Sequence, residues 1–148
     1  IDSNIIRQAG GTVVTDLRAV LPQIDVVTIH CPKTLETQSL IGRVELDAMK
    51  TSAILINTAR GGIVNETDLY EALYSGSIAG AGIDVFEKEP PDPEHPLLTL
   101  PNVVLSPHCA GVTSESLILM AQIAAQNVLD AFDGTLGAEM VANREVLR

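Results

Sequence analysis

The chain has 148 residues, enough for one domain with a sizeable core, and it is 46% hydrophobic but only 3% aromatic, so Ile, Leu, Val and Ala must fill the interior. Its 19 acidic and 9 basic residues give a formal charge of −10, which opposes binding to nucleic acid or to an anionic membrane because phosphate contacts need a basic surface. No apolar run is long enough to cross a bilayer, and the first residues lack the layout of a signal peptide. The two cysteines form no C-x-x-C pair. We therefore expect a cytoplasmic protein with reduced thiols.

Short helices and strands alternate in the first part of the chain. Residues 2–11 predict a short helix, and residues 12–14 predict a short strand. Asp16 can cap a helix over residues 17–21. Residues 25–30 are β-branched and apolar, which predicts a strand.

The central part predicts a short helix followed by a buried strand. We expect Val44, Leu46 and Met49 to be the buried positions of this helix. Residues 53–56 form a short apolar run, which is typical of a parallel sheet that helices cover on both faces. Two glycines then break the strand in the segment 57–62.

A second helix begins after this strand. Asn65 is a good N-cap, and Asp68 stands three residues later in the manner of a capping box. Gly76 marks the end of the helix. Its apolar stripe consists of Leu69, Ala72 and Leu73.

The last part predicts two strands and the longest helix. A strand over residues 83–86 leads into residues 87–101, which hold five of the eight prolines and must form an extended loop. Residues 103–106 form the last strand, Thr113 caps the helix, and Gly134 ends it. The apolar stripe of this helix comprises Leu117, Met120, Ala121, Ala124, Val128, Leu129 and Phe132.

This alternation predicts the α/β class with a doubly wound parallel sheet. No G-x-G-x-x-G motif occurs. The nearest approach, residues 80–82, precedes a predicted strand, so we interpret it as small residues in a tight turn between helix and strand.

Polar residues stand at the carboxyl ends of the predicted strands, which meet at one edge of a parallel sheet. They are His30, Cys31, Asn57, Arg60, Asp84, Glu87, Glu89, His108 and Cys109. An arginine can hold a carboxylate bidentately, a histidine can transfer a proton near neutral pH, and a carboxylate can orient that histidine. The set therefore indicates acid–base chemistry on an anionic substrate.

Each residue also has a structural interpretation. Arg60 could stabilise a surface turn, His108 could be a buried histidine bonded to the backbone, and Glu89 could be a solvated side chain in an acidic loop. We interpret His95, in the same loop, as a surface residue. A metal site is a further alternative, because histidine and cysteine are adjacent in His30-Cys31 and in His108-Cys109. Adjacent residues rarely direct both side chains at one ion, so we expect no metal.

Three ordered segments resemble the D-2-hydroxyacid dehydrogenase family, which includes phosphoglycerate dehydrogenases, glyoxylate/hydroxypyruvate reductases and D-lactate dehydrogenases. The segments are INTARGGIVN (56–65), DVFEKEP (84–90) and PNVVLSPH (101–108). The resemblance runs from about residue 10 to residue 147. Arg60 and Glu89 are 29 positions apart, the interval that this family keeps between its catalytic arginine and glutamate.

The resemblance implies a catalytic set of Arg60, Glu89 and His108. Arg60 would bind the substrate carboxylate and the oxygen being reduced, His108 would donate the proton, and Glu89 would pair with His108. Formate dehydrogenases share the fold but have glutamine at the position of Glu89, which favours a small 2-hydroxy or 2-oxo acid as substrate.

The resemblance also implies NAD or NADP as the cofactor. Cys31 and Pro32 would lie against its adenosine side, Thr58 and Ala59 near the nicotinamide, and Asp84 would bind the carboxamide. The complete set of implied cofactor-binding residues is Cys31, Pro32, Thr37, Thr58, Ala59, Arg60, Asp84, His108, Ala110 and Gly111.

The sequence departs from the family at its beginning. The substrate domain, the first two strands and the glycine-rich turn have no counterpart, so the Rossmann-like sheet of order 3-2-1-4-5-6 would be incomplete. Residues 12–14 would be strand 3 and residues 25–30 strand 4, with a gap between them. We therefore expect residues 1–148 to be the C-terminal part of the dinucleotide-binding domain of a two-domain dehydrogenase, complete at its C-terminus, homodimeric at full length, and inactive when isolated.

A second hypothesis is a dinucleotide-sensing interaction module without turnover. The same family contains the C-terminal-binding corepressors, which use the fold to control assembly. Retention of Arg60, Glu89 and His108 is compatible with both hypotheses.

Overall fold

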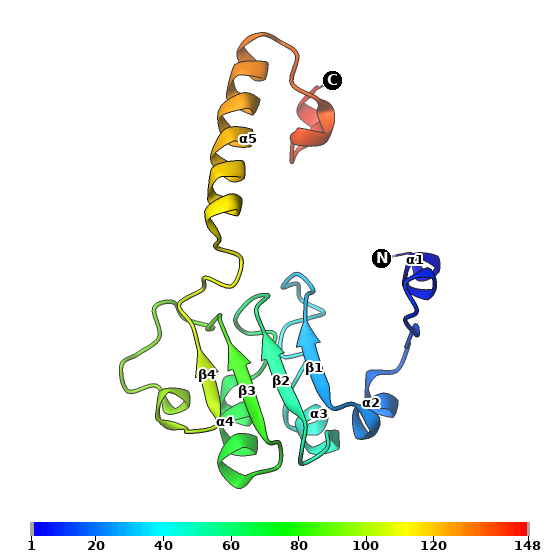
Figure 1. The fold of residues 1–148 in the computed structure, drawn as a ribbon, viewed down its shortest axis with the longest axis vertical. Coiled ribbons are helices and arrows are strands. Elements are labelled where there is room, and N and C mark those ends of the chain that lie inside the picture. The colour runs from blue at the N-terminus through cyan, green and yellow to red at the C-terminus, as the bar shows by residue number, and fades with distance from the viewer. Residues whose placement is uncertain (1, 148) are drawn as a thin grey trace. The chain divides into compact units, whose positions relative to one another are not determined.

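The computed structural model describes residues 2–147, which divide into two units, one ending at Ala110 and one beginning at Gly111 (Figure 1). The first unit is an α/β structure, as predicted. Its elements in chain order are α1 (Ser3–Gln8), α2 (Leu17–Val20), η1 (Leu21–Gln23), β1 (Val26–Ile29), α3 (Arg43–Ala48), β2 (Ile54–Asn57), α4 (Glu66–Ser75), β3 (Gly80–Ile83), η2 (Pro96–Thr99) and β4 (Val103–Leu105).

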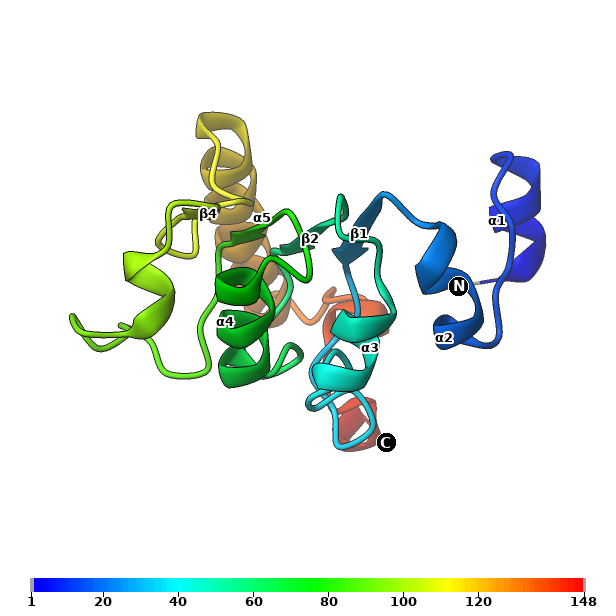
Figure 2. The same cartoon turned by 90° about the horizontal axis from the view of Figure 1, so that it is seen from below.

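The four strands form one parallel sheet in the order β1-β2-β3-β4. Because this order runs in one direction, right-handed crossovers must place the connecting helices on one face. Figures 1 and 2 show α3 and α4 together on that face. The described strands thus represent one winding of the expected Rossmann-like sheet.

Side chains alternate between the two faces of the sheet. Ile29, Leu55 and Ile83 belong to the core, which also includes residues of α3 and α4. On the opposite face Ile54 is 42% exposed and Val104 is 76% exposed. Helices of this unit therefore cover one face of the sheet, not both faces as residues 53–56 predicted.

Two predictions about strands are wrong. Residues 12–14 form no strand, because an extended segment becomes a strand only by pairing, and it has no pairing partner in the described chain. Residues 80–82 are not a turn but belong to β3, where they pair with residues 54–56 of β2. The strand predicted over residues 83–86 is thus displaced towards the N-terminus: β3 ends at Ile83, and residues 84–86 lie beyond it.

The predicted helix caps are mostly confirmed. Asp16 accepts hydrogen bonds at the start of α2, and Asn65 Oδ1 accepts one from Asp68 N, 3.0 Å away. The reciprocal bond of a capping box does not form, because Asn65 N donates to Ile41 O at 2.9 Å, while the Asp68 carboxylate accepts from Arg43 N. In α3, Leu46 is buried as predicted, but Val44 is 57% exposed.

The second unit contains α5 (Ser114–Phe132), η3 (Ala138–Met140) and η4 (Arg144–Leu147). Thr113 caps α5 as predicted, through a hydrogen bond from Ser116 N. No residue of α5 is buried, so the predicted apolar stripe lies exposed in this unit. Among residues 2–147 no helix combines the length and apolarity needed to cross a bilayer.

Candidate active site

Asn57 fixes the turn that carries Arg60 at the carboxyl end of β2. The Asn57 side chain is buried, accepts a hydrogen bond from Ala59 N at 3.1 Å and donates one to Arg60 O at 3.1 Å. The next residue, Gly61, lies against the segment after β3, since a Cβ there would stand 1.8 Å from Phe86 O. Arg60 itself is exposed, and its guanidinium donates to Ala59 O at 2.6 Å.

Asp84 organises the turn around His108. Its carboxylate is buried and accepts hydrogen bonds from Ser106 Oγ (2.5 Å), Cys109 N (2.8 Å) and Ala110 N (2.9 Å). Its backbone oxygen accepts from His108 N at 2.8 Å. His108 has φ of +54°, a left-handed conformation that a non-glycine residue keeps only where its surroundings fix it.

Asp84 is held in its charged form. Burial raises the pKa of Asp84, but the hydrogen bonds from Ser106, Ala110 and Cys109 and the charge of protonated His108 lower it by more, so the pKa lies below its ordinary value. A negative charge therefore persists below the His108 turn across the neutral pH range.

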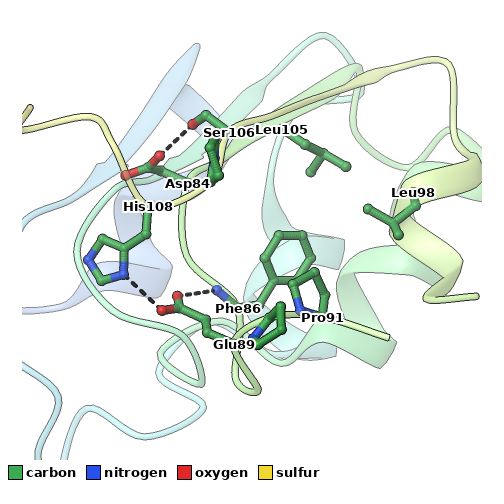
Figure 3. A pocket seen from close by; sticks show the side chains of 10 residues that line it. Asp84, Phe86, Glu89, Pro91, Leu98, Leu105, Ser106 and His108 are labelled. Carbon is green, nitrogen blue, oxygen red and sulfur yellow. Dashed lines mark hydrogen bonds and ion pairs between the residues drawn. The ribbon is translucent and has the colours of Figure 1, made fainter. Parts of the chain in front are cut away.

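Glu89 and His108 form the central pair of the site (Figure 3). Glu89 Oε2 lies 2.8 Å from His108 Nδ1, and Glu89 Oε1 accepts from Phe86 N at 3.0 Å. The bond to His108, the Phe86 N–H and the charges of His108 and Arg60 together lower the pKa of Glu89. An ionised carboxylate can only accept, so Nδ1 carries the proton and Nε2 is the nitrogen left for exchange with a substrate.

Two hollows adjoin these side chains. The first, of about 380 Å³, is lined by Glu89 and His108 together with apolar residues that include Phe86, Leu98 and Leu105 (Figure 3). The second, of about 490 Å³, lies at the carboxyl ends of β1 and β2. It is lined by His30, Cys31, Pro32, Lys33, Thr58, Ala59 and Arg60.

The structure brings most of the expected residues together. Glu89 and His108 are in contact, and Arg60 lines the neighbouring hollow, from which its charge acts on the Glu89 carboxylate. These contacts replace the solvated interpretation of Glu89. With its side chain 45% exposed, His108 is also not the buried histidine of the alternative interpretation.

Most of the implied cofactor residues line one of the two hollows: Asp84 and His108 line the first, and Arg60 lines the second. Cys31, Pro32, Thr58 and Ala59 line the second hollow. Thr37 does not line it, since its Oγ1 donates to Pro32 O at 2.7 Å and thereby closes the loop after β1. Ala110 N donates to Asp84, and Gly111 begins the second unit, where its backbone oxygen accepts from Ser116 Oγ at 2.8 Å.

Sequence reasoning missed two features of this region. His95, interpreted as a surface residue, has a side chain only 20% exposed, and its Nε2 lies 3.1 Å from Glu66 Oε2. Lys33 shares the second hollow with Arg60. Neither residue stands in a periodic segment or directly at a strand end, so no sequence signal singled it out. Within residues 2–147 no three His, Cys, Asp or Glu side chains gather as metal ligands would.

Comparison with known proteins gives one consistent family. The profile described as D-isomer specific 2-hydroxyacid dehydrogenase, NAD binding domain, matches residues 2–110. Glyoxylate reductase from Thermofilum pendens is 48% identical over 134 residues, which are 90% of this chain and 39% of the reductase. The chain spans between 24% and 42% of the length of such curated relatives.

Solved structures similar to this chain belong to the same family. The NADPH-dependent glyoxylate/hydroxypyruvate reductase from Sinorhizobium meliloti, in complex with NADP and malonate, superposes with a TM-score of 0.77 and 36% identity, over 83% of this chain and 38% of that one. The NAD-complexed D-isomer specific 2-hydroxyacid dehydrogenase from Lactobacillus delbrueckii ssp. bulgaricus superposes with a TM-score of 0.74 and 38% sequence identity. The match covers 81% of this chain and 40% of that one.

Proposed function

The chain belongs to the D-isomer specific 2-hydroxyacid dehydrogenase family, and from this premise we propose that it carries the catalytic groups of an NAD(P)-dependent enzyme that interconverts a D-2-hydroxy acid and a 2-oxo acid. One observation carries the proposal: the Glu89–His108 pair at 2.8 Å, with the charge of Arg60 acting on the same carboxylate. A charged pair and a free guanidinium at one sheet edge match what reduction of an anionic carbonyl compound requires.

Arg60 binds the substrate in this proposal. Its guanidinium offers five N–H donors, of which the structure uses one for Ala59 O. The remaining donors can hold the substrate carboxylate bidentately and reach the carbonyl oxygen beside it. This orients the carbonyl carbon and stabilises the negative charge that develops on its oxygen.

His108 transfers the proton. With Nδ1 bonded to Glu89, protonated His108 gives its Nε2 proton to the carbonyl oxygen during reduction and takes it back during oxidation. Glu89 keeps the imidazole in this orientation and balances its charge. Asp84 accepts from the Ser106 side chain before His108, from His108 N itself and from Cys109 N after it, and so holds this turn in place.

The second hollow fits the nicotinamide end of the cofactor. Thr58 and Ala59 are small residues and leave room for a flat ring, whereas Cys31 and Pro32 line the part of the same hollow that we assign to the adenosine side. Asp84 lines the first hollow, beside His108, and not the second. Its Oδ2 accepts a single hydrogen bond, from Ala110 N, so it retains a lone pair that can accept from a carboxamide reaching it from the second hollow. When bound, the cofactor supplies or accepts the hydride.

We further propose that residues 1–148 form the C-terminal part of the dinucleotide-binding domain of a two-domain dehydrogenase. The matched profile describes such a domain, and four parallel strands of one winding supply part of its sheet. Homodimer formation, a small 2-oxo acid as the partner and a cytoplasmic location stay predictions from the family resemblance.

A chimera tests the proposal, with this chain replacing the matching segment of a glyoxylate reductase to which it is similar. We expect the chimera to reduce glyoxylate or hydroxypyruvate, and His108→Gln to abolish turnover while dinucleotide binding persists. A folded chimera that binds the dinucleotide without turnover would contradict the enzyme proposal. If the dinucleotide then shifts its oligomeric state, the sensing module is favoured instead.

A further inference from the structure

Glu66 and His95 form a second acid–histidine pair, which the proposed chemistry does not use. Glu66 begins α4, His95 lies in the loop after β3, and both side chains are mostly buried, with exposed fractions of 17% and 20%. His95 Nδ1 accepts a hydrogen bond from Leu97 N at 3.3 Å, so the proton of neutral His95 resides on Nε2. Nε2 then donates to Glu66 Oε2 at 3.1 Å.

The same carboxylate also holds the beginning of the loop. Glu66 Oε1 accepts a hydrogen bond from Glu87 N at 2.5 Å. The His95 ring meets Phe86 edge to face, with 5.3 Å between the ring centres and an angle of 80°. Glu66 and His95 thus fix two consecutive residues, Phe86 and Glu87.

These two residues carry the restraint on to Glu89. Phe86 N donates to Glu89 Oε1 at 3.0 Å, and the other oxygen of that carboxylate meets His108 at 2.8 Å. A continuous set of contacts therefore runs from α4 through His95 and Phe86 to Glu89 and His108. Glu89 is exposed and has few other restraints, so its direction depends on this backbone segment.

We propose that Glu66 and His95 are positioning residues, which hold Phe86 and Glu87 in the place from which Glu89 meets His108. The catalytic meaning of this pair rests on the proposed function, but the positioning does not. If the Glu66–His95 pair only stabilised the loop, its removal would lower the free energy of unfolding and leave the Glu89–His108 contact unchanged.

Nuclear magnetic resonance of the labelled 148-residue chain separates these cases. We would follow the carboxyl ¹³C titration of Glu89 and the hydrogen exchange of the Phe86 amide in Glu66→Ala, in His95→Ala and in the double variant. Glu71→Ala is the matched control, because Glu71 is an exposed glutamate on the same helix. Glu66→Gln keeps an acceptor oxygen for Glu87 N and serves as the conservative variant.

Each alanine variant should raise the pKa of Glu89 towards its ordinary value and speed exchange of the Phe86 amide by about tenfold or more. The double variant should add little to the larger single effect, because the two residues act through one contact set. Glu66→Gln should restore part of the effect, and Glu71→Ala should change neither quantity. Should Glu66→Ala fail to fold, His95→Ala still gives the test, because His95 lies outside α4.

Folded variants that lose stability but keep the wild-type Glu89 titration and Phe86 exchange would overturn the proposal. The readout involves no turnover, so it stands apart from the proposed function. An inactive chimera in which Glu89 still pairs with His108 would overturn the proposed function alone.

Discussion

Arg60 is positioned through its backbone, which leaves its side chain available. The buried Asn57 amide bonds to the backbone of Ala59 and Arg60, so the turn is fixed without using the hydrogen-bond donors of the Arg60 guanidinium. For substrate binding, the planar geometry of the Arg60 guanidinium then matters more than its charge. A lysine ammonium is a point charge and cannot hold the carboxylate and carbonyl oxygens of the substrate together.

Arg60→Lys in the active chimera should therefore raise KM and lower kcat together. Loss of a charge-assisted bidentate bond is worth about 1.5–3 kcal/mol, so kcat/KM should fall by roughly 10- to 150-fold in steady-state kinetics. Arg43→Lys is the matched control, since Arg43 is an exposed arginine of α3. An unchanged rate in Arg60→Lys would remove Arg60 from the proposed role.

The sequence could predict the principal residues because strand ends mark the functional edge of a parallel sheet. Arg60 and His108 follow that rule directly. Glu89 is further from its strand and needed the family spacing to stand out. The contact of His95 with Glu66 could not be predicted, because a hydrogen bond between residues 29 positions apart leaves no local pattern. The Asn57 bonds to Ala59 and Arg60 are local, but their form depends on the conformation of the turn, which the sequence does not specify.

At the scale of elements, the turn after β2 and the segment after β3 depend on a glycine. A Cβ at Gly61 would stand 1.8 Å from Phe86 O and 2.0 Å from Phe86 C, which are backbone atoms that cannot move aside alone. This close approach keeps Arg60 next to the segment that carries Glu89.

Gly61→Ala should consequently destabilise the first unit by about 1–3 kcal/mol or more in urea unfolding, since overpacking that forces a backbone shift typically costs that much. Gly82→Ala in β3 is the control. Its Cβ would lie 3.8 Å from Ile56, an ordinary contact, so stability should stay within about 1 kcal/mol of wild type. Equal stability of the two variants would show that the turn can relax.

Caps could be predicted more reliably than strands, since a cap is a local bond and a strand is a pairing. Asp16 caps α2 and Asn65 caps α4, each by accepting a hydrogen bond from a backbone N–H of the first turn. Residues 12–14 have strand-forming side chains but find no pairing partner within residues 2–147, whereas residues 80–82 lack such side chains and yet pair between β2 and β4. Glycine fits a central strand here because its neighbours supply the hydrogen bonds.

At the scale of the whole molecule, dinucleotide binding depends on more than the described hollow. The 148 residues contain no G-x-G-x-x-G turn, which anchors the pyrophosphate in this fold. The chain alone should therefore bind NADH weakly, with Kd of about 1 mM, and the titration should shift the amide resonances of His30, Cys31, Lys33 and residues 58–60. A Kd near 1 μM would show that the chain provides another pyrophosphate site.

The pH dependence of stability follows from three carboxylates of the first unit. Burial raises the pKa of Glu45, but hydrogen bonds from Gly42 N and Arg18 lower it by more. The pKa values of Asp84 and Glu89 are also lowered in the fold. All three groups bind a proton less readily in the folded state than in the unfolded chain. Their stabilising contribution is therefore complete above the ordinary carboxyl pKa of about 4 and is lost as the pH falls towards the folded-state values.

The formal charge of −10 acts in the opposite direction, because protonation relieves repulsion among the acidic residues. We expect the paired carboxylates to dominate below about pH 4, where the free energy of unfolding in urea should decline with falling pH. Asp84→Asn should be less stable than wild type at neutral pH, since an amide presents N–H groups to the Cys109 and Ala110 donors, and it should show a flatter acid decline. Glu71→Gln, an exposed control, should keep the wild-type slope. A stability that instead rises below pH 4 would mean that charge repulsion outweighs the hydrogen bonds holding the His108 turn.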